Sequence, residues 1–108
     1  MITEETITAA YEAQGKALEG LYSAHELVAH EEHELECARI LVMAKNSPKD
    51  LGPNETAQKM KMNQLCEIEI NNLAMAETEE RQARYQYSAA QIAVKRIESL
   101  IEFLAIRQ

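Results

Sequence analysis

The stretch Asn46-Ser47-Pro48-Lys49-Asp50-Leu51-Gly52-Pro53-Asn54 contains both prolines of the 108-residue chain. Pro48 and Pro53 cannot continue a helix, whereas Ser47 and Asn54 are residue types that commonly begin one. The flanking sequences are rich in Ala, Glu, Leu, Ile and Met, most of which favour helices. We therefore predict a single helical domain over 1–108, with one helix at about 3–45, a loop at 46–53 and a second helix at about 54–107.

The first predicted helix has a recognisable beginning and one apolar stripe. Thr3 is a suitable N-cap, and Glu4 and Glu5 favour the positive end of the helix dipole. Apolar residues then recur at intervals of three, four and seven, which is the spacing of one helix face. These residues are Ile7, Ala10, Tyr11, Leu18, Leu21, Val28, Leu35, Ala38 and Val42.

The second predicted helix has a matching stripe, and its later part has the spacing of a coiled coil. The stripe consists of Met62, Leu65, Cys66, Leu73, Ala76, Ala83, Tyr87, Ala90, Val94, Ile97, Ile101 and Leu104. The two stripes are interrupted by Glu31, Glu32 and Glu80, which we expect to be buried acids that set register or partner choice. The predicted fold is an all-α, long antiparallel two-helix hairpin, coiled-coil-like in its packing.

The end of the second helix is the most apolar part of the chain and predicts self-association. Folding the chain at the loop places Ile2 opposite about Glu98, which leaves the following turns without a partner. A homodimer that forms a four-helix bundle would cover this surface. The alternatives are a frayed tail, or a first helix that begins earlier and packs against a bent second helix. The residues expected at the contact are Ile97, Leu100, Ile101, Phe103 and Leu104.

Charge is concentrated in the first helix. The net charge is −7, and no Lys or Arg occurs between Glu19 and Ala38, where six Glu and all three His lie. Such a surface repels nucleic acid and suits a basic protein partner, although simple solubility is the alternative. The partner-binding residues that we predict on this acidic face are Glu26, Glu31, Glu32, Glu34 and Glu36.

The same segment offers the only pattern that suggests a metal. Glu26, His30, His33 and Cys37 are spaced to project from one helix face, and zinc accepts such ligands. An open helix surface gives the histidines no supporting groups, and the HExxH spacing is absent. We therefore expect no metal and no cofactor, and keep His30, His33 and Cys37 as weak candidates.

Other features of the sequence argue against secretion, membrane insertion and catalysis. The beginning of the sequence lacks a signal peptide, and no segment is apolar enough to span a membrane. We expect a cytoplasmic protein with two reduced thiols, Cys66 buried on the stripe and Cys37 facing outward. A two-helix hairpin is expected to lack a concave pocket, so we predict that the protein is not an enzyme.

The segment Lys49-Asp50-Leu51-Gly52-Pro53-Asn54-Glu55-Thr56-Ala57 resembles small helical-hairpin proteins of phages and prophages, an uncharacterised family. In that family a Leu-Gly-Pro-Asn-Glu turn separates two long helices, and the second ends in an apolar heptad run. The tail from Glu80 to Leu100 has a similar rhythm. The likeness implies a protein of the host cell cytoplasm, and supplies no catalytic residues.

The resemblance and the charge pattern leave three hypotheses for function. The first is a protein-interaction module whose acidic surface inhibits a host defence nuclease or CRISPR effector. The second is an accessory or scaffold protein in phage recombination or assembly, which would bind through the apolar tail. The third is a metal or pH sensor that would use His30, His33 and Cys37.

Overall fold

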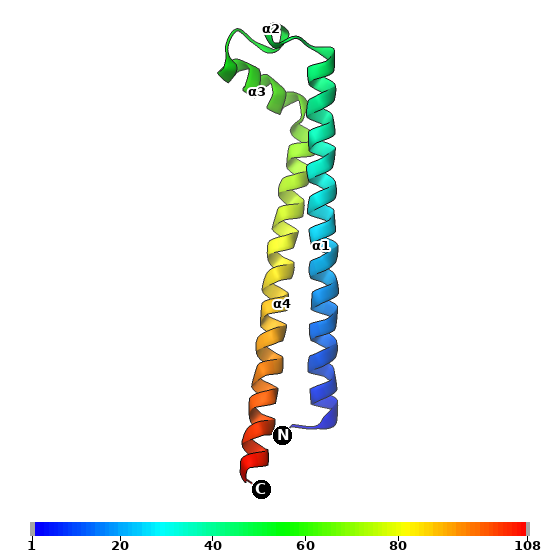
Figure 1. The fold of residues 1–108 in the computed structure, drawn as a ribbon, viewed down its shortest axis with the longest axis vertical. Helices are drawn as coiled ribbons and strands as arrows, with labels where there is room; N and C mark the ends of the chain where they lie inside the picture. Colours follow the sequence, from blue (N-terminus) through cyan, green and yellow to red (C-terminus); the bar gives the residue numbers. More distant parts are fainter. Residues whose placement is uncertain (1, 108) are drawn as a thin grey trace. The chain divides into compact units, whose positions relative to one another are not determined.

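The computed structural model describes residues 2–107, and the protein is all-α over this range. Four helices follow in order: α1 (Glu4–Lys45), α2 (Pro48–Leu51), α3 (Glu55–Leu65) and α4 (Glu67–Arg107). The long helices α1 and α4 pack against each other and run in opposite directions, which confirms the predicted helical hairpin (Figure 1). None of the helices in residues 2–107 is both long enough and apolar enough to cross a membrane.

The ends of α1 form where the sequence predicts them. The hydroxyl of Thr3 accepts a hydrogen bond from the amide of Thr6 at 3.1 Å, and the Thr3 carbonyl accepts from Ile7 at 3.1 Å. At the other end, the amide and the side chain of Asn46 both donate to the carbonyl of Val42, at 3.1 and 3.0 Å. These bonds satisfy backbone groups that a helix end leaves unpaired.

The predicted loop contains the short helix α2, and its ends are held by local hydrogen bonds. The amide of Ser47 donates to the Asp50 carboxylate at 2.9 Å, and this bond lowers the pKa of that carboxyl. Asn54 caps α3 as predicted, since its side-chain oxygen accepts from the amide of Ala57 at 2.9 Å. Between α2 and α3, the side-chain amide of Gln58 donates a hydrogen bond to the carbonyl of Gly52 at 3.2 Å.

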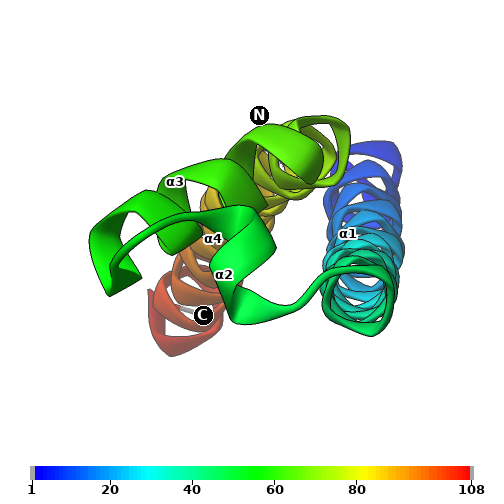
Figure 2. The same cartoon turned by 90° about the horizontal axis from the view of Figure 1, so that it is seen from above.

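The second predicted helix is divided, so its prediction as one continuous helix was wrong. Cys66 has φ −107° and ψ 19°, which ends α3 and separates it from α4. Figures 1 and 2 show that α3 leaves the direction of α4, and α3 packs against α2. Leu65-Cys66-Glu67 contains no Gly or Pro, so no local signal marks the break.

Packing divides the chain into two units, and residues 2–24 and 79–107 form the first. Ala24 and Val94 are its buried apolar residues. The hydroxyl of Tyr11 donates to Glu98 at 2.8 Å, and this bond is the main reason why the pKa of Tyr11 is raised. The predicted register was wrong, because it placed Ile2 opposite Glu98, about two and a half turns from the observed partner.

Residues 25–78 form the second unit, which contains α2, α3 and the adjoining parts of α1 and α4. Its buried residues are Val28, Leu35, Cys66 and Ala76, and Cys66 is the only fully buried side chain among them. Small side chains therefore make up much of the core.

Most residues of the two predicted stripes are buried or half-buried, which confirms the periodicity. Two positions were predicted wrongly as covered, since Tyr11 is 46% exposed and Leu65 is 48% exposed. Ile101 and Leu104 are 41% and 50% exposed, and they belong to the end of the second helix that the sequence analysis left without a partner. The chain exposes 8387 Å² of surface, whereas a compact monomer of 12.2 kDa would expose about 6,100 Å². Much apolar surface is therefore in contact with water.

Candidate functional site

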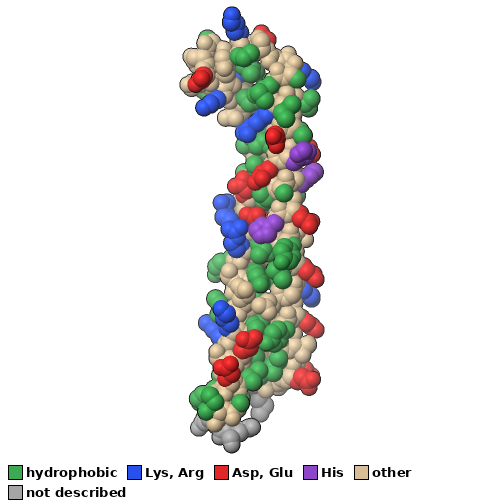
Figure 3. Space-filling model, viewed as in Figure 1, with side chains coloured by type: hydrophobic (Ala, Val, Ile, Leu, Met, Phe, Trp, Pro, Cys, Tyr) green, Lys and Arg blue, Asp and Glu red, His purple; other side chains and the backbone are tan. Residues whose placement is uncertain are grey.

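The acidic segment of α1 carries several exposed glutamates and no Lys or Arg between Glu19 and Ala38. Glu26, Glu32, Glu34 and Glu36 are exposed, whereas Glu31 is half-buried. The five residues do not share a single face, because at 100° per residue Glu31 falls beside the buried positions Val28 and Leu35. At this spacing they are distributed around the helix rather than gathered on one side of it. Figure 3 shows acidic side chains, in red, along one face of the molecule.

The acids expected to be buried differ in their surroundings. Glu31 is half-buried as expected, and the side chain of Glu80 is only 19% exposed and pairs with Arg84 of the same helix at 3.3 Å. Glu32 is exposed, so its predicted burial was wrong. Its neighbour Glu31 occupies the covered position instead, because a helix brings only one of two adjacent residues to the packed face.

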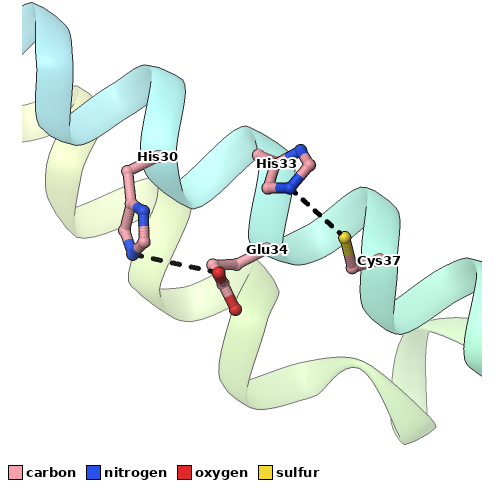
Figure 4. A network of polar contacts seen from close by, with 4 residues as sticks. All are labelled: His30, His33, Glu34 and Cys37. Atoms are coloured by element: carbon pink, nitrogen blue, oxygen red, sulfur yellow. Dashed lines mark hydrogen bonds and ion pairs between the residues drawn. The ribbon is translucent and has the colours of Figure 1, made fainter.

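The histidine segment forms two separate pairs (Figure 4). His30 Nε2 lies 4.0 Å from Glu34 Oε1, and His33 Nε2 lies 3.6 Å from the Cys37 sulfur. Glu26 joins neither pair. Across residues 2–107, no group of three or more His, Cys, Asp or Glu side chains is arranged to hold a metal ion. The candidates His30, His33 and Cys37 thus lie on one helix without forming a common site.

The two cysteines are free and have different surroundings. Cys66 is fully buried, and this burial raises the pKa of its thiol, an effect that nearby Glu69 reinforces and Arg39 opposes. Its sulfur contacts the sulfur of Met62 at 4.0 Å. Cys37 is half-exposed on α1, so only Cys66 fits its predicted environment fully.

The apolar tail of α4 is exposed, although the corrected register brings it level with the first turns of α1. Among the predicted contact residues, Ile97 is half-buried and belongs to the packed side of the helix. The other four remain exposed at 48% for Leu100, 41% for Ile101, 54% for Phe103 and 50% for Leu104. Ile106, at 84%, belongs to the same apolar end of the helix, and Ile92, at 52%, is an exposed residue near Leu100 that the sequence analysis missed.

A pocket in residues 25–78 contradicts the expectation that the hairpin has none. Its volume is about 650 Å³, and it lies among the end of α1, α2 and α3. The lining residues are Arg39, Met43, Asn46, Pro48, Leu51, Glu55, Gln58, Lys59, Met62 and Asn63. The pocket exists because α3 leaves the direction of α4 at Cys66, which no feature of the local sequence predicts.

Comparisons with known protein families, with curated proteins and with solved structures found no match for this chain. The functional argument therefore depends on charge, exposure and geometry.

Proposed function

We propose that this chain is a non-enzymatic protein-interaction module, encoded by a phage or prophage, whose acidic α1 surface inhibits a host defence nuclease or CRISPR effector by binding its basic surface. The binding residues in this proposal are Glu26, Glu32, Glu34 and Glu36. Glu31 is better assigned to packing between the helices, because it is half-buried.

The observation that carries this proposal is the uncompensated charge of residues 19–38. This segment contains six Glu and no Lys or Arg. Glu26, Glu32 and Glu36 form no ion pair with any residue in 2–107, and Glu34 pairs only with His30. Nucleases carry basic channels for their polyanionic substrates, and an acidic helix is complementary to such a channel.

The large exposed surface also favours a partner. The exposed surface of the chain is more than one third larger than that of a compact monomer of the same mass, by the usual scaling of area with mass. A binding partner would cover part of this area.

The test is to neutralise the four exposed glutamates together and measure binding to nucleases or effector complexes from the bacterial host. In the variant E26Q/E32Q/E34Q/E36Q, each lost charge is expected to weaken binding by about 0.5 kcal/mol. Together they predict about a thirtyfold loss of affinity at low salt, and a weaker dependence of affinity on salt.

The matched control neutralises four exposed glutamates outside α1. The variant E67Q/E77Q/E79Q/E102Q changes the net charge by the same amount and alters only exposed positions. An equal loss of binding in both variants would show that net charge alone is responsible, and would refute the assignment to α1. No binding of the unchanged protein to any defence protein would refute the proposed partner class.

A second function, favoured by the exposed tail of α4, is that of a self-associating scaffold in phage recombination or assembly. Leu100 and Leu104 are about half exposed, a turn apart on one helix. A two-fold dimer would use each of these residues twice. We expect L100E/L104E to shift the mass in light scattering from dimer to monomer, whereas I68E, at another exposed isoleucine, leaves it unchanged. A monomeric unchanged protein would rule out the dimer.

A further inference from the structure

The pocket among α1, α2 and α3 combines an apolar lining with positive charge. Met43, Leu51 and Met62 contribute apolar side chains, and Arg39 and Lys59 are its two cations. Figure 3 shows basic and hydrophobic side chains close together on the part of the surface that these helices form. Its volume of about 650 Å³ lies within the range of sites that bind small organic molecules.

The two cations are available to a ligand. Within residues 2–107, neither Arg39 nor Lys59 forms a hydrogen bond or ion pair with another residue. Glu55 is the only acid in the lining, so the cations outnumber the acids at this place in a protein of net charge −7. Unpaired cations beside apolar side chains complement a molecule that carries one negative group on an apolar body.

The walls of the pocket are fixed by the hydrogen bonds of the α2–α3 segment. The Ser47 amide to Asp50, the Asn54 cap on Ala57 and the bond from Gln58 to Gly52 hold this segment in one conformation. The side chain of Asn46 is also held, because it donates to the Val42 carbonyl. A pocket that is formed before binding loses less entropy when a ligand enters.

We propose that this pocket binds a small amphipathic monoanion, such as a medium-chain carboxylate, with Arg39 and Lys59 around the negative group and Met43, Leu51 and Met62 around the apolar part. Arg39 is suited to the role because a guanidinium presents a planar pair of donors that matches a carboxylate. The pocket's volume of about 650 Å³ and its position among three helices favour a small molecule over an extended peptide.

The experiment uses decanoate as the probe, below its micelle concentration, and the methionine methyl groups of the full chain as reporters. Decanoate is expected to shift the NMR signals of Met43 and Met62, which line the pocket, and not those of Met60 and Met75. Met60 and Met75 are 61% and 64% exposed elsewhere on the chain, so they report non-specific contact. Equal shifts at all four methyl groups, or no shifts, would overturn the proposal.

The role of charge is tested separately. We expect R39Q/K59Q to raise the dissociation constant of decanoate at least tenfold, and to leave the binding of neutral decanol unchanged. The matched variant K95Q/R96Q removes two cations next to exposed apolar residues of α4 and is expected to leave decanoate binding unchanged. An unchanged dissociation constant in R39Q/K59Q, with circular dichroism confirming an intact fold, would overturn the assignment of the two cations.

Discussion

Gly52 lies where the chain passes from α2 to α3, and its lack of a side chain allows a close approach. A Cβ atom placed on Gly52 would lie 2.7 Å from the Cβ of Ala57 and 3.0 Å from the Ala57 carbonyl carbon. Carbon atoms in ordinary contact are about 3.5–4.0 Å apart, so the two segments would have to separate. One of the two close atoms belongs to the backbone of α3, which cannot rotate away. We therefore predict that Gly52→Ala destabilises the protein.

The magnitude follows from the overlap. Inserting a methyl group into a filled space typically costs about 1–3 kcal/mol. The φ angle of Gly52 is 161°, close to fully extended, so alanine adds no backbone strain there. Reduced flexibility of the unfolded chain offsets about 0.5 kcal/mol of the cost. The expected net loss is about 1–2 kcal/mol, which lowers the melting temperature by about 5–15 °C for a domain of this size.

The same substitution at Gly20 is the control. A Cβ at Gly20 meets no atom within 4 Å, and the residue lies within α1. Alanine is favoured over glycine in a helix by up to about 1 kcal/mol, so Gly20→Ala should stabilise the protein. One chemical change thus has opposite expected signs at two positions of the same chain.

Thermal unfolding followed by circular dichroism measures both variants, and hydrogen exchange locates the effect. Gly52→Ala should increase amide exchange in residues 46–66, and Gly20→Ala should not. If Gly52→Ala melts at or above the temperature of the unchanged protein, the close packing of α2 on α3 is not present in solution. If Gly20→Ala is destabilising, the space around Gly20 is not open in solution.

Three further predictions test the core, the thiols and the cap of α3. Leu35→Ala should lower the free energy of unfolding in urea by about 2–4 kcal/mol, because Leu35 is 6% exposed. Leu41 is 58% exposed, so Leu41→Ala should lower it by less than about 1 kcal/mol, and equal losses would contradict the assigned packed face of α1. At pH 8 a thiol reagent should label Cys37 before the buried Cys66, and rapid labelling of both thiols would refute the burial of Cys66. The free energy of unfolding should also fall as the pH rises past the ordinary cysteine pKa of about 8.5, because burial raises the pKa of Cys66 in the folded protein and only the unfolded chain then ionises this thiol readily. Asn54→Ala should cost about 1 kcal/mol by loss of the cap, with Asn54→Asp retaining most of the stability, as measured by thermal unfolding.

The sequence predicts those features that depend on neighbouring residues. The Thr3 cap, the end of α1 before Asn46 and the Asn54 cap are all signalled within a few residues, and all three are present. The stripes are also local in this sense, because their periodicity is visible along a single helix. Helix type, most helix ends and most of the packed side of each helix were therefore predictable.

The features that depend on how distant segments meet were not predictable. The pairing of Tyr11 with Glu98 depends on how much of the chain is used in the connection between α1 and α4. That connection includes α3 as well as the loop, because the chain changes direction at Cys66. The pocket follows from the same change of direction, so Arg39 and Lys59 could not be identified together from their positions in the sequence.

The small side chains of the core and the large exposed surface also determine how the protein responds to heat. The folded chain already exposes about 8,400 Å², so unfolding adds less new surface to water than it does for a compact protein. The newly exposed area is about four fifths of that of a compact protein of the same mass. The heat capacity change should fall in proportion, to about 1.0–1.3 kcal/mol/K. The curve of stability against temperature should then be unusually flat, so that cooling and warming around its maximum change the folded population little.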